Sequence, residues 1–366
     1  MKFTCNREIF FDYISKVSRA VSAKSTIPAL EGIFIKAERG NIYLTGYDLE
    51  LGVSTSMPAE VQEEGSIVLN ARLLIDIISK LPGSTVSFSK NDLLITIKSG
   101  ITEFTILGNS AEDFPELPEV EYDEMISIDG ISLKSMIDQT IFAVSVTDQN
   151  PVHTGSLFDI EEGEIKMVSV DGCRLALRRE KIDYQGSKKF VVPSKTLLEV
   201  SRFINPETEE NVDFGVTKKH IVVKIDNLTV ISRLLEGDFL DYKAAIATKV
   251  NTKIKIDVKT LLDSVNRVSL LITDRIKSPI KCIFEDNTLK MSCATAVGKA
   301  YDEIFCDMQG ENFEIGFNNK YLADALKAVS CDEVYLLVNN SFSPMQIVPC
   351  ESDEFLFLVL PVRLKG

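Results

Sequence analysis

The sequence is poor in the residues that build metal, disulfide and acid–base sites. Its 366 residues include no tryptophan, only two histidines (His153 and His220), and seven cysteines without a CxxC pair. The cysteines are Cys5, Cys173, Cys282, Cys293, Cys306, Cys331 and Cys350. Zinc sites and disulfide frameworks need closely paired ligands, so we expect neither a metal nor a cofactor.

Long hydrophobic runs are also missing. The longest, such as FLFLVLPV near the C-terminus, fall far short of the roughly 20 residues needed to cross a bilayer. In the opening MKFTCNREIFF, Arg7 and Glu8 interrupt any apolar region of a signal peptide. We therefore expect a cytoplasmic protein without a membrane span. A hydrophobic content of 45% is ample for buried cores.

Positive charge is in short supply as well. Forty Lys and Arg residues stand against 54 Asp and Glu residues, which gives a net charge of −14. Phosphate contacts draw on Lys and Arg, so this balance argues at first sight against a nucleic-acid partner.

The chain does contain an internal repeat. Residues 3–17 align without gaps on residues 67–81, and an acidic residue recurs at intervals of 64, 62, 61, 64 and 61 residues. The recurring acids are Asp12, Asp76, Asp138, Glu199, Asp263 and Asp324. Six units of about 61 residues therefore fill the chain.

Each unit predicts a helix with strands around it. The residue six positions before the acid is expected to cap the helix, with Ser194 replacing Pro193 in the fourth unit. These cap positions are Asn6, Asn70, Ser132, Pro193, Asp257 and Asn318. Apolar residues four and eleven positions after the cap share one helix face, and they begin with Phe10 and Val17. Between the helices, alternation with a period of two is typical of antiparallel strands.

Pairs of units predict the domain organisation. Asp113-Phe114 and Asp238-Phe239 lie 125 residues apart, which is about two units. We therefore expect three similar α+β domains, over residues 1–122, 123–248 and 249–366, each a duplicated strand-helix-strands unit.

The charges are unevenly distributed over this repeat. The six helical segments together carry +5, so the rest of the chain carries −19. For one helix alone, a solvent-exposed face with intrahelical pairs explains such spacing. None of the six equivalent helices has a negative net charge. If they share one side of the protein, that side is locally positive. DNA carries one charge per ~1.7 Å of axis, so each helix could face several phosphates.

No enzymatic motif is present. The sequence lacks GxxxxGK[ST], GxGxxG after a strand, HExxH and GxSxG. The pairs Ser15-Lys16, Ser79-Lys80 and Ser194-Lys195 could suggest a Ser-Lys nucleophile, but two of them occupy the same repeat position, which favours a scaffold. We expect no catalytic residues and no enzyme.

About nine segments, spread from the first residue to the last, carry a family resemblance. They include MKFT, IPALEGIFI (27–35), LTGYDLEL (44–51), EDFPELP, VDGCRLAL (170–177), EGDFLDY (236–242), IGFNNKYLADAL (315–326), SPMQIVP (343–349) and LVLPVRL (358–364). In order and spacing the chain resembles the bacterial DNA polymerase III beta subunit, the replication sliding clamp.

The resemblance implies a fold and a function. Members of that family are head-to-tail homodimeric rings, with helices lining a channel and antiparallel sheets outside. It implies a processivity factor that encircles and slides on double-stranded DNA without sequence preference, and that tethers the replicative polymerase. Lys24, Arg72, Gln149 and Lys195 match family DNA contacts, with Lys24 at a position where Arg is commoner. Helix position alone adds Arg19, Lys80, Arg202, Lys259, Arg267, Lys320 and Lys327.

The resemblance also implies a peptide-binding pocket and a ring contact. The pocket, between domains two and three, captures short linear peptides of polymerases, the clamp loader and repair proteins. It would comprise Asp171, Gly172, Arg174, Leu175, Leu240, Asn318, Tyr321, Met345, Leu358, Leu360, Pro361, Val362 and Arg363. Cys173 replaces a usual His and Leu240 a usual Pro. The C-terminal strand could be a plain edge strand and still serve this role.

For the ring contact, residues of domain one would meet residues of domain three in the partner copy. They are Lys98, Phe104 and Ile106 on one side, and Leu270, Leu271, Asp302 and Glu303 on the other. The alternative hypothesis is a repeat-built protein-interaction scaffold that does not encircle DNA.

Overall fold

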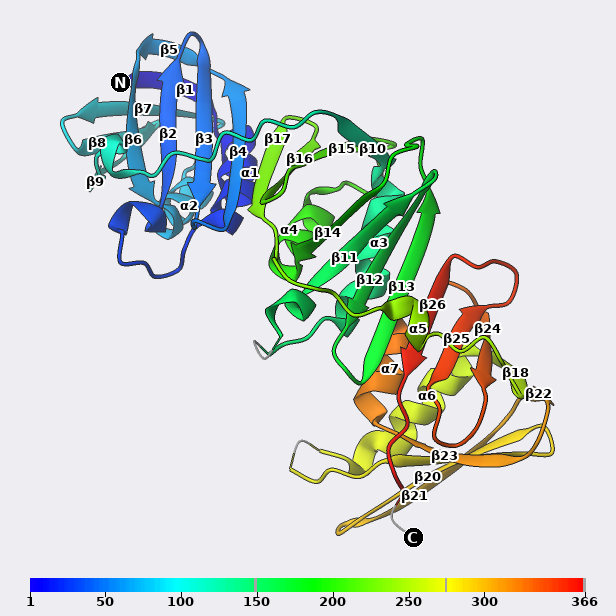
Figure 1. The fold of residues 1–366 in the computed structure, drawn as a ribbon. Helices are drawn as coiled ribbons and strands as arrows, with labels where there is room; N and C mark the ends of the chain where they lie inside the picture. The colour runs from blue at the N-terminus through cyan, green and yellow to red at the C-terminus, as the bar shows by residue number, and fades with distance from the viewer. Residues whose placement is uncertain (148–149, 274, 365–366) are drawn as a thin grey trace. The chain divides into compact units, whose positions relative to one another are not determined.

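The computed structural model describes residues 1–147, 150–273 and 275–364. The chain forms two compact units (Figure 1): Met1–Ile131 with Glu199–Leu234, called unit 1 here, and Ser132–Leu198 with Leu235–Gly366, called unit 2. Their boundaries pass through helices α3 (Gly130–Thr140) and α4 (Ser194–Phe203).

Unit 1 contains two antiparallel sheets. One has the strand order β5-β1-β7-β8-β9 and the other the order β10-β15-β16-β17-β4-β3-β2-β6. The strands and helices are β1 (Lys2–Asn6), α1 (Arg7–Val17), β2 (Gly32–Glu38), β3 (Asn41–Tyr47), β4 (Leu51–Pro58), β5 (Glu60–Glu63), β6 (Gly65–Asn70), α2 (Ala71–Lys80), β7 (Thr85–Asn91), β8 (Leu94–Ser99), β9 (Thr102–Leu107), β10 (Met125–Asp129), β15 (Asn211–Val216), β16 (His220–Ile225) and β17 (Leu228–Arg233).

Unit 2 also contains two antiparallel sheets, with the orders β14-β11-β12-β13-β26-β25-β24-β18-β22 and β21-β20-β19-β23. Its elements are β11 (Gly155–Glu161), β12 (Glu164–Val170), β13 (Arg174–Lys181), β14 (Lys188–Pro193), α5 (Tyr242–Ala245), β18 (Thr252–Asp257), α6 (Val258–Val268), β19 (Ile280–Glu285), β20 (Thr288–Thr295), β21 (Gly298–Phe305), β22 (Asp307–Gln309), β23 (Phe313–Phe317), α7 (Asn319–Lys327), β24 (Glu333–Val338), β25 (Met345–Pro349) and β26 (Phe355–Val359).

Two sheets run across the domain boundaries expected from the repeat. Strand β17 pairs with β4, so one sheet holds strands from both sides of residue 122. Strand β13 pairs with β26, so another holds strands from both sides of residue 248. Each pairing covers strand edges that would otherwise be open to other chains.

Four predicted helix caps are confirmed. The Asn6 side chain accepts hydrogen bonds from the backbone N–H groups of Glu8 and Ile9. Asn70 and Asp257 do the same for Leu73 and Thr260. Asn318 caps α7 through Lys320 N and Tyr321 N, at 2.9 and 3.4 Å. Such caps satisfy the unpaired donors of a first helical turn.

The predicted cap at Ser132 is wrong. Helix α3 begins at Gly130, directly after β10, so Ser132 already lies in its first turn. The Gly130 N–H donates to the Glu210 carbonyl at 2.9 Å, as the first N–H of α1 donates to Ser84. Asp129 therefore holds the position of the other caps, and Asp138 lies about one turn later than the other recurring acids. Positions three residues apart share a helix face, so the apolar pattern could not reveal this shift. In the fourth unit the helix begins at Ser194, directly after Pro193.

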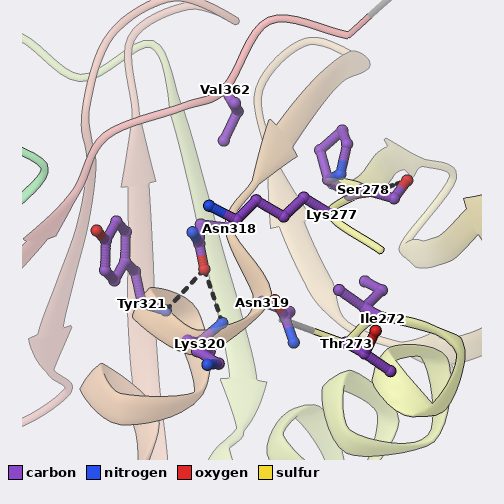
Figure 2. A pocket seen from close by; sticks show the side chains of 10 residues that line it. Ile272, Thr273, Lys277, Ser278, Asn318, Asn319, Lys320, Tyr321 and Val362 are labelled. Atoms are coloured by element: carbon purple, nitrogen blue, oxygen red, sulfur yellow. Dashed lines mark hydrogen bonds between the residues drawn. The ribbon is translucent and has the colours of Figure 1, made fainter. Parts of the chain in front are cut away.

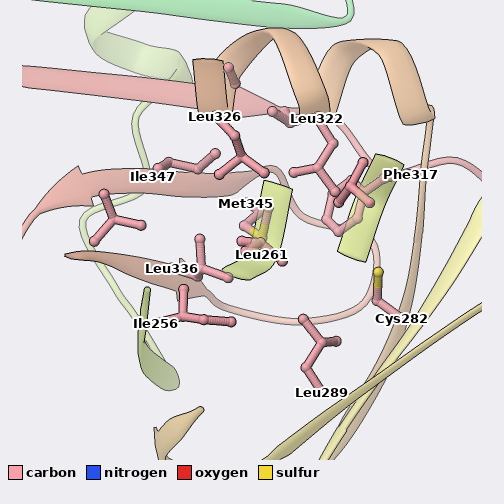
Figure 3. Packing of buried hydrophobic residues seen from close by; sticks show 14 of the residues in the cluster. Ile256, Leu261, Cys282, Leu289, Phe317, Leu322, Leu326, Leu336, Met345 and Ile347 are labelled. Atoms are coloured by element: carbon pink, nitrogen blue, oxygen red, sulfur yellow. The ribbon is translucent and has the colours of Figure 1, made fainter. Parts of the chain in front are cut away.

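The apolar face of the helices is buried as predicted. Phe10, Leu74 and Met136 are fully buried, and the same position in the later helices is at most 3% exposed. In unit 2, Leu261 of α6 packs in one cluster with Leu322 and Leu326 of α7, over the sheet residues Ile256 and Leu336 (Figure 3). Burying one such side chain contributes about 1.5–3 kcal/mol, so these faces fix the helices on their sheets.

Candidate nucleic-acid and peptide-binding sites

The predicted DNA-contacting cations all lie on the surface. Helix positions put them on α2, α4, α6 and α7, and Lys24 lies in the loop that follows α1. Lys24, Arg72, Lys80, Lys195, Arg202, Lys259, Arg267, Lys320 and Lys327 are all exposed, as is Arg19. Gln149 lies outside the described residues. Within unit 1, Ala23, which precedes Lys24, lines one pocket together with Arg72.

Arg202, Arg19 and Arg267 have carboxylate partners. Arg202 pairs with Glu199 on its own helix, and Arg19 approaches the same carboxylate at 3.9 Å. Arg267 pairs with Asp302 of β21 at 2.6 Å, and the Ser264 hydroxyl also donates to that carboxylate. Burial raises the pKa of Asp302, but the hydrogen bonds from Ser264 and Arg267 outweigh it, so its pKa is lowered. The charges of Arg202 and Arg267 are therefore partly neutralised within the chain itself.

Arg174 organises the predicted peptide-binding residues of unit 2. Its Nε donates to Asp171 at 2.8 Å and its Nη1 to Asp324 at 2.6 Å. The guanidinium carbon lies 4.6 Å from the centre of the Tyr321 ring and 5.5 Å from that of Phe142. Only 11% of the Arg174 side chain is exposed. A planar, largely buried guanidinium of this kind holds together the elements that supply its partners.

The turn before Arg174 is equally well defined. The Asp171 carboxylate accepts hydrogen bonds from the backbone N–H groups of Cys173 and Arg174, at 2.9 and 3.1 Å. Gly172 has a φ of 84°, a conformation that favours glycine. Burial raises the pKa of Tyr321, and the nearby Asp171 carboxylate raises it further, so this phenol stays neutral near pH 7.

The remaining predicted pocket residues separate into buried and exposed groups. Leu175, Met345 and Leu358 are at most 3% exposed, and Leu175 lies opposite Leu358 in the β13–β26 pair. Leu240, Leu360 and Val362 are 47%, 38% and 42% exposed; Pro361 is half-buried and Arg363 is exposed. Leu175 and Leu358 share one buried cluster, whereas Met345 packs in the cluster beneath α6 and α7, so the structure brings together only two of these three residues.

A pocket of about 420 Å³, called the α7 pocket here, continues from these residues (Figure 2). It is lined by Ile272, Thr273, Lys277, Ser278, Pro279, Asn318, Asn319, Lys320, Tyr321 and Val362. The C-terminal segment is held beside it because the Val362 N–H donates to the Gly316 carbonyl at 2.8 Å.

Sequence reasoning missed part of this site. Phe142 stacks on Arg174, and Lys277 reaches the α7 pocket from the segment after α6. Asp324 was interpreted only as a repeat marker, yet it is an ion-pair partner of Arg174. The available signal was the repeat itself, which places an acid on every helix.

The residues predicted for the ring contact lie on or next to two edge strands, one in each unit. In unit 1, β9 is a sheet edge; Phe104 is 37% exposed, Ile106 is half-buried, and Lys98 on the next strand pairs with Glu103 at 3.6 Å. In unit 2, β21 is a sheet edge that carries Asp302 and Glu303. Leu270 is 80% exposed, whereas Leu271 packs partly against the core.

Neither histidine is placed for acid–base chemistry. Burial lowers the pKa of both His153 and His220, so both stay neutral near pH 7. Burial also raises the pKa of the Cys5 and Cys282 thiols to about 12, which keeps them protonated. In the part of the chain that the structure describes, no helix is long and apolar enough to cross a membrane.

Comparisons with known proteins cover the whole chain. Residues 1–118, 127–241 and 243–363 match the N-terminal, central and C-terminal domains of the DNA polymerase III beta subunit. The beta sliding clamp of Staphylococcus aureus is 33% identical over 375 residues, covering 99% of each chain. The crystal structure of the Bacillus subtilis DNA polymerase sliding clamp has a TM-score of 0.96 at 32% identity, and that of the Thermotoga maritima DNA polymerase III beta subunit 0.93 at 27%, both covering 100% of each chain.

These matches agree with the antiparallel sheets and the repeated helices described above. The chain belongs to the DNA polymerase III beta subunit family, the beta sliding clamps, which are non-catalytic processivity factors of DNA replication.

Proposed function

We propose that two copies of this chain form a head-to-tail ring that encircles duplex DNA and slides on it. The observation that carries this proposal is the charge distribution: six helical segments carry +5 while the rest of the chain carries −19. If the helices line the channel, their exposed cations face phosphates and the acidic exterior repels DNA. Phosphate contacts carry no sequence information, which suits a protein that must slide.

Within this ring, Lys24, Arg72, Lys80, Lys195, Arg202, Lys259, Arg267 and Lys320 are the proposed DNA contacts, together with Gln149. Arg72, Lys80 and Lys259 are the strongest candidates, since they are exposed and have no ion-pair partner among the described residues. Arg202 and Arg267 would contribute less, because Glu199 and Asp302 already pair with them.

Ring closure is proposed to pair β9 of one copy with β21 of the other. Both are edge strands with unpaired backbone groups, and edge strands are templates for pairing with another chain. Apolar side chains accompany them: Leu107 is 70% exposed on β9, while Phe305 and Leu270 are 76% and 80% exposed on and beside β21. Such a contact joins unlike surfaces and closes into a ring when the rotation permits.

The surface around Arg174 is proposed to bind short linear peptides of the polymerase, the clamp loader and repair proteins. Leu175 and Leu358 would form its floor, Met345 would support it from the core beneath α6 and α7, and Leu240, Leu360 and Pro361 would contact the peptide. Asn318, Tyr321, Val362 and Arg363 would extend the site along the C-terminal segment, with Asp171, Gly172 and Arg174 shaping one wall.

The repeat supports three structural domains, 1–122, 123–248 and 249–366, as the units of this architecture. The two compact units do not coincide with these three domains, because two sheets are shared between neighbouring domains. Strands β17 and β4 join the first and second domains, and β13 and β26 join the second and third.

Topology provides the test of encirclement. The protein, loaded by its clamp loader on nicked circular DNA, should stay bound through gel filtration and be released when a restriction enzyme linearises the DNA. Equal retention on linear DNA with free ends would favour the alternative, an interaction scaffold without encirclement. Arg72→Glu, Lys195→Glu and Lys259→Glu together should reduce retention on the circle, more strongly at raised salt.

Peptide capture has its own test. Leu360→Ala with Pro361→Ala should abolish binding of a polymerase-derived peptide in fluorescence anisotropy, while sedimentation shows an unchanged dimer. Unchanged peptide affinity would exclude the surface around Arg174 as the peptide site.

A further inference from the structure

The edge strand β21 belongs to a hairpin that extends beyond its neighbour in the sheet. Strands β20 and β21 pair as far as the turn, where Thr295 lies opposite Gly298. The other neighbour of β20 is β19, and the pairing that the structure describes between these two strands ends at Ser292. Figure 1 shows the hairpin as a long ribbon. A two-stranded ribbon is only marginally stable by itself, so the outer part of this hairpin needs support from outside the sheet.

Helix α6 provides this support through polar groups. The Asp302 carboxylate of β21 accepts a hydrogen bond from the Ser264 hydroxyl at 2.5 Å, and two from Nη2 and Nε of Arg267 at 2.6 and 3.0 Å. On β20, the Cys293 thiol donates to the Val268 carbonyl at 3.1 Å. Both strands of the hairpin are thereby attached to one helix. Hydrogen bonds between charged groups are the stronger ones, so Asp302 is the principal attachment.

Asp302 lies on the face of its sheet that α6 covers. It is opposite Met291, which is fully buried, and cross-strand partners share a face. Ser264 is fully buried as well, so its hydroxyl depends on the Asp302 carboxylate. The neighbouring side chains alternate in direction, and Tyr301 and Phe305 are exposed. The Asp302 carboxylate is therefore engaged within its own subunit.

The edge strand of unit 1 is held on its sheet differently. On β9, Phe104 and Ile106 lie opposite the buried Ile97 and Ile95, so apolar side chains occupy the face that β9 turns to its core. Apolar burial is non-directional, whereas hydrogen bonds to a carboxylate require a defined geometry. Asp302 therefore fixes the position of β21 more narrowly than apolar packing fixes that of β9.

We propose that Asp302 is a positioning residue for ring closure, which ties β21 to α6 through Ser264 and Arg267 and so presets the strand edge for β9 of the other copy. This inference rests on the proposed ring. An edge that is already ordered loses less conformational freedom on association, so its attachment strengthens the dimer. Asp302 itself does not contact the partner copy, and its effect depends on Arg267.

The test is a double-mutant cycle on the full-length protein without DNA. Sedimentation equilibrium gives the dissociation constant of the dimer for the unmodified protein, Asp302→Ala, Arg267→Ala and the two changes together. Asp302→Asn, which keeps one acceptor oxygen, is the milder variant. The matched control is Glu314→Ala, which also removes one carboxylate from this sheet. Glu314 pairs with Lys281 at 2.7 Å and lies on β23, the opposite edge strand.

Asp302→Ala and Arg267→Ala should each raise the dissociation constant about tenfold, and the double variant should raise it no further. Asp302→Asn should raise it about threefold, and Glu314→Ala should leave it unchanged. If Arg267→Ala has no effect while Asp302→Ala weakens the dimer, Asp302 contacts the partner copy directly and the inference is wrong. A rise of about a hundredfold in the double variant would show two independent effects and would also overturn it.

Hydrogen exchange separates positioning from a general loss of stability. At a concentration where every variant is dimeric, the backbone N–H groups of β20 and β21 should exchange faster in Asp302→Ala, while those of β18 and β24 keep their rate. Uniformly faster exchange throughout unit 2 would mean that Asp302 only stabilises the fold, which contradicts the inference.

The ring and the role of Asp302 fail differently. If the unmodified protein stays monomeric at micromolar concentration, both proposals are wrong. If it forms a dimer whose dissociation constant none of the Asp302 and Arg267 variants changes, the ring stands and the positioning role is wrong.

Discussion

A pocket of unit 1 lies between the end of α1 and the start of α2, and is called the α2 pocket here. It occupies the same place in the repeat as the α7 pocket of unit 2, and the two have nearly equal volumes, about 410 and 420 Å³. Each lies at the start of a helix capped by an Asn, Asn70 in one case and Asn318 in the other. Among the residues that the structure describes, carboxylates line only the first, those of Glu31 and Asp76. The repeat therefore fixes where a pocket forms, and a few side chains decide what it can hold.

The C-terminal segment makes the second difference between the two pockets. In unit 2 the C-terminal segment runs beside the α7 pocket, since the Leu360 N–H donates to the Cys173 carbonyl at 2.9 Å and Val362 lines the pocket. In unit 1 the Glu31 side chain lines the equivalent pocket and accepts a hydrogen bond from the Ser25 N–H at 3.0 Å. An apolar surface beside one pocket and an acidic one beside the other suit different ligands.

The largest expected contrast is between two arginines of the two units, Arg174 and Arg72. Arg174→Ala should lower the free energy of unfolding by about 3 kcal/mol, because it leaves the largely buried Asp171 carboxylate without its cationic partner. Arg72→Ala should change it by less than about 0.5 kcal/mol, because Arg72 is exposed. Urea unfolding followed by circular dichroism measures both. Equal effects would contradict a structural role for the Arg174 network.

A second contrast concerns the two asparagine caps. Asn70→Ala and Asn318→Ala should each cost about 1 kcal/mol of stability, since each removes a helix cap. Only Asn318→Ala should also weaken peptide binding, measured by anisotropy with Asn318→Asp as the cap-preserving control. A similar loss of peptide binding in Asn70→Ala would show that the effect comes from stability alone.

The smallest expected effect is a difference in the pH dependence of stability between a helix capped by Asp and a helix capped by Asn. The Thr260 hydrogen bonds lower the pKa of the Asp257 cap below its usual 3.8. A lowered folded-state pKa stabilises the protein above the usual value, and that contribution is lost as the pH falls through the lowered one. The loss should be below about 1 kcal/mol.

Urea unfolding at pH 7 and pH 3 tests this prediction. The acid-dependent loss should be reduced in Asp257→Asn and gained in Asn70→Asp, which transfers the titrating cap to unit 1. An identical pH dependence in all three proteins would refute the role of the cap.

Much of the local structure could be predicted from the sequence. Asn6, Asn70, Asp257 and Asn318 cap helices as expected, because a cap depends on contacts within three residues. The error at Ser132 has a local cause as well: Gly130 is a poor helix former, but its N–H bonds to Glu210, 80 residues away. The residues of the helix alone cannot reveal a contact with Glu210.

The candidate site was predictable only in part. The pocket residues came from a family resemblance, and the structure brings Asp171, Arg174 and Tyr321 together around one guanidinium. Phe142 and Lys277 were missed because each joins the site from another part of the chain. Their sequence neighbourhoods carry no motif that marks them.

The sequence by itself determined the six repeated helices, their buried faces and the separation of basic helices from an acidic remainder. These properties follow from periodicity and composition, which act over a few residues. The tertiary structure alone decided that two sheets join strands from both sides of residues 122 and 248, that Asp324 pairs with Arg174, and that Lys277 lines the α7 pocket. Such contacts join residues up to 185 positions apart, as in the pair Arg174 and Val359, and only the packed fold brings them within reach.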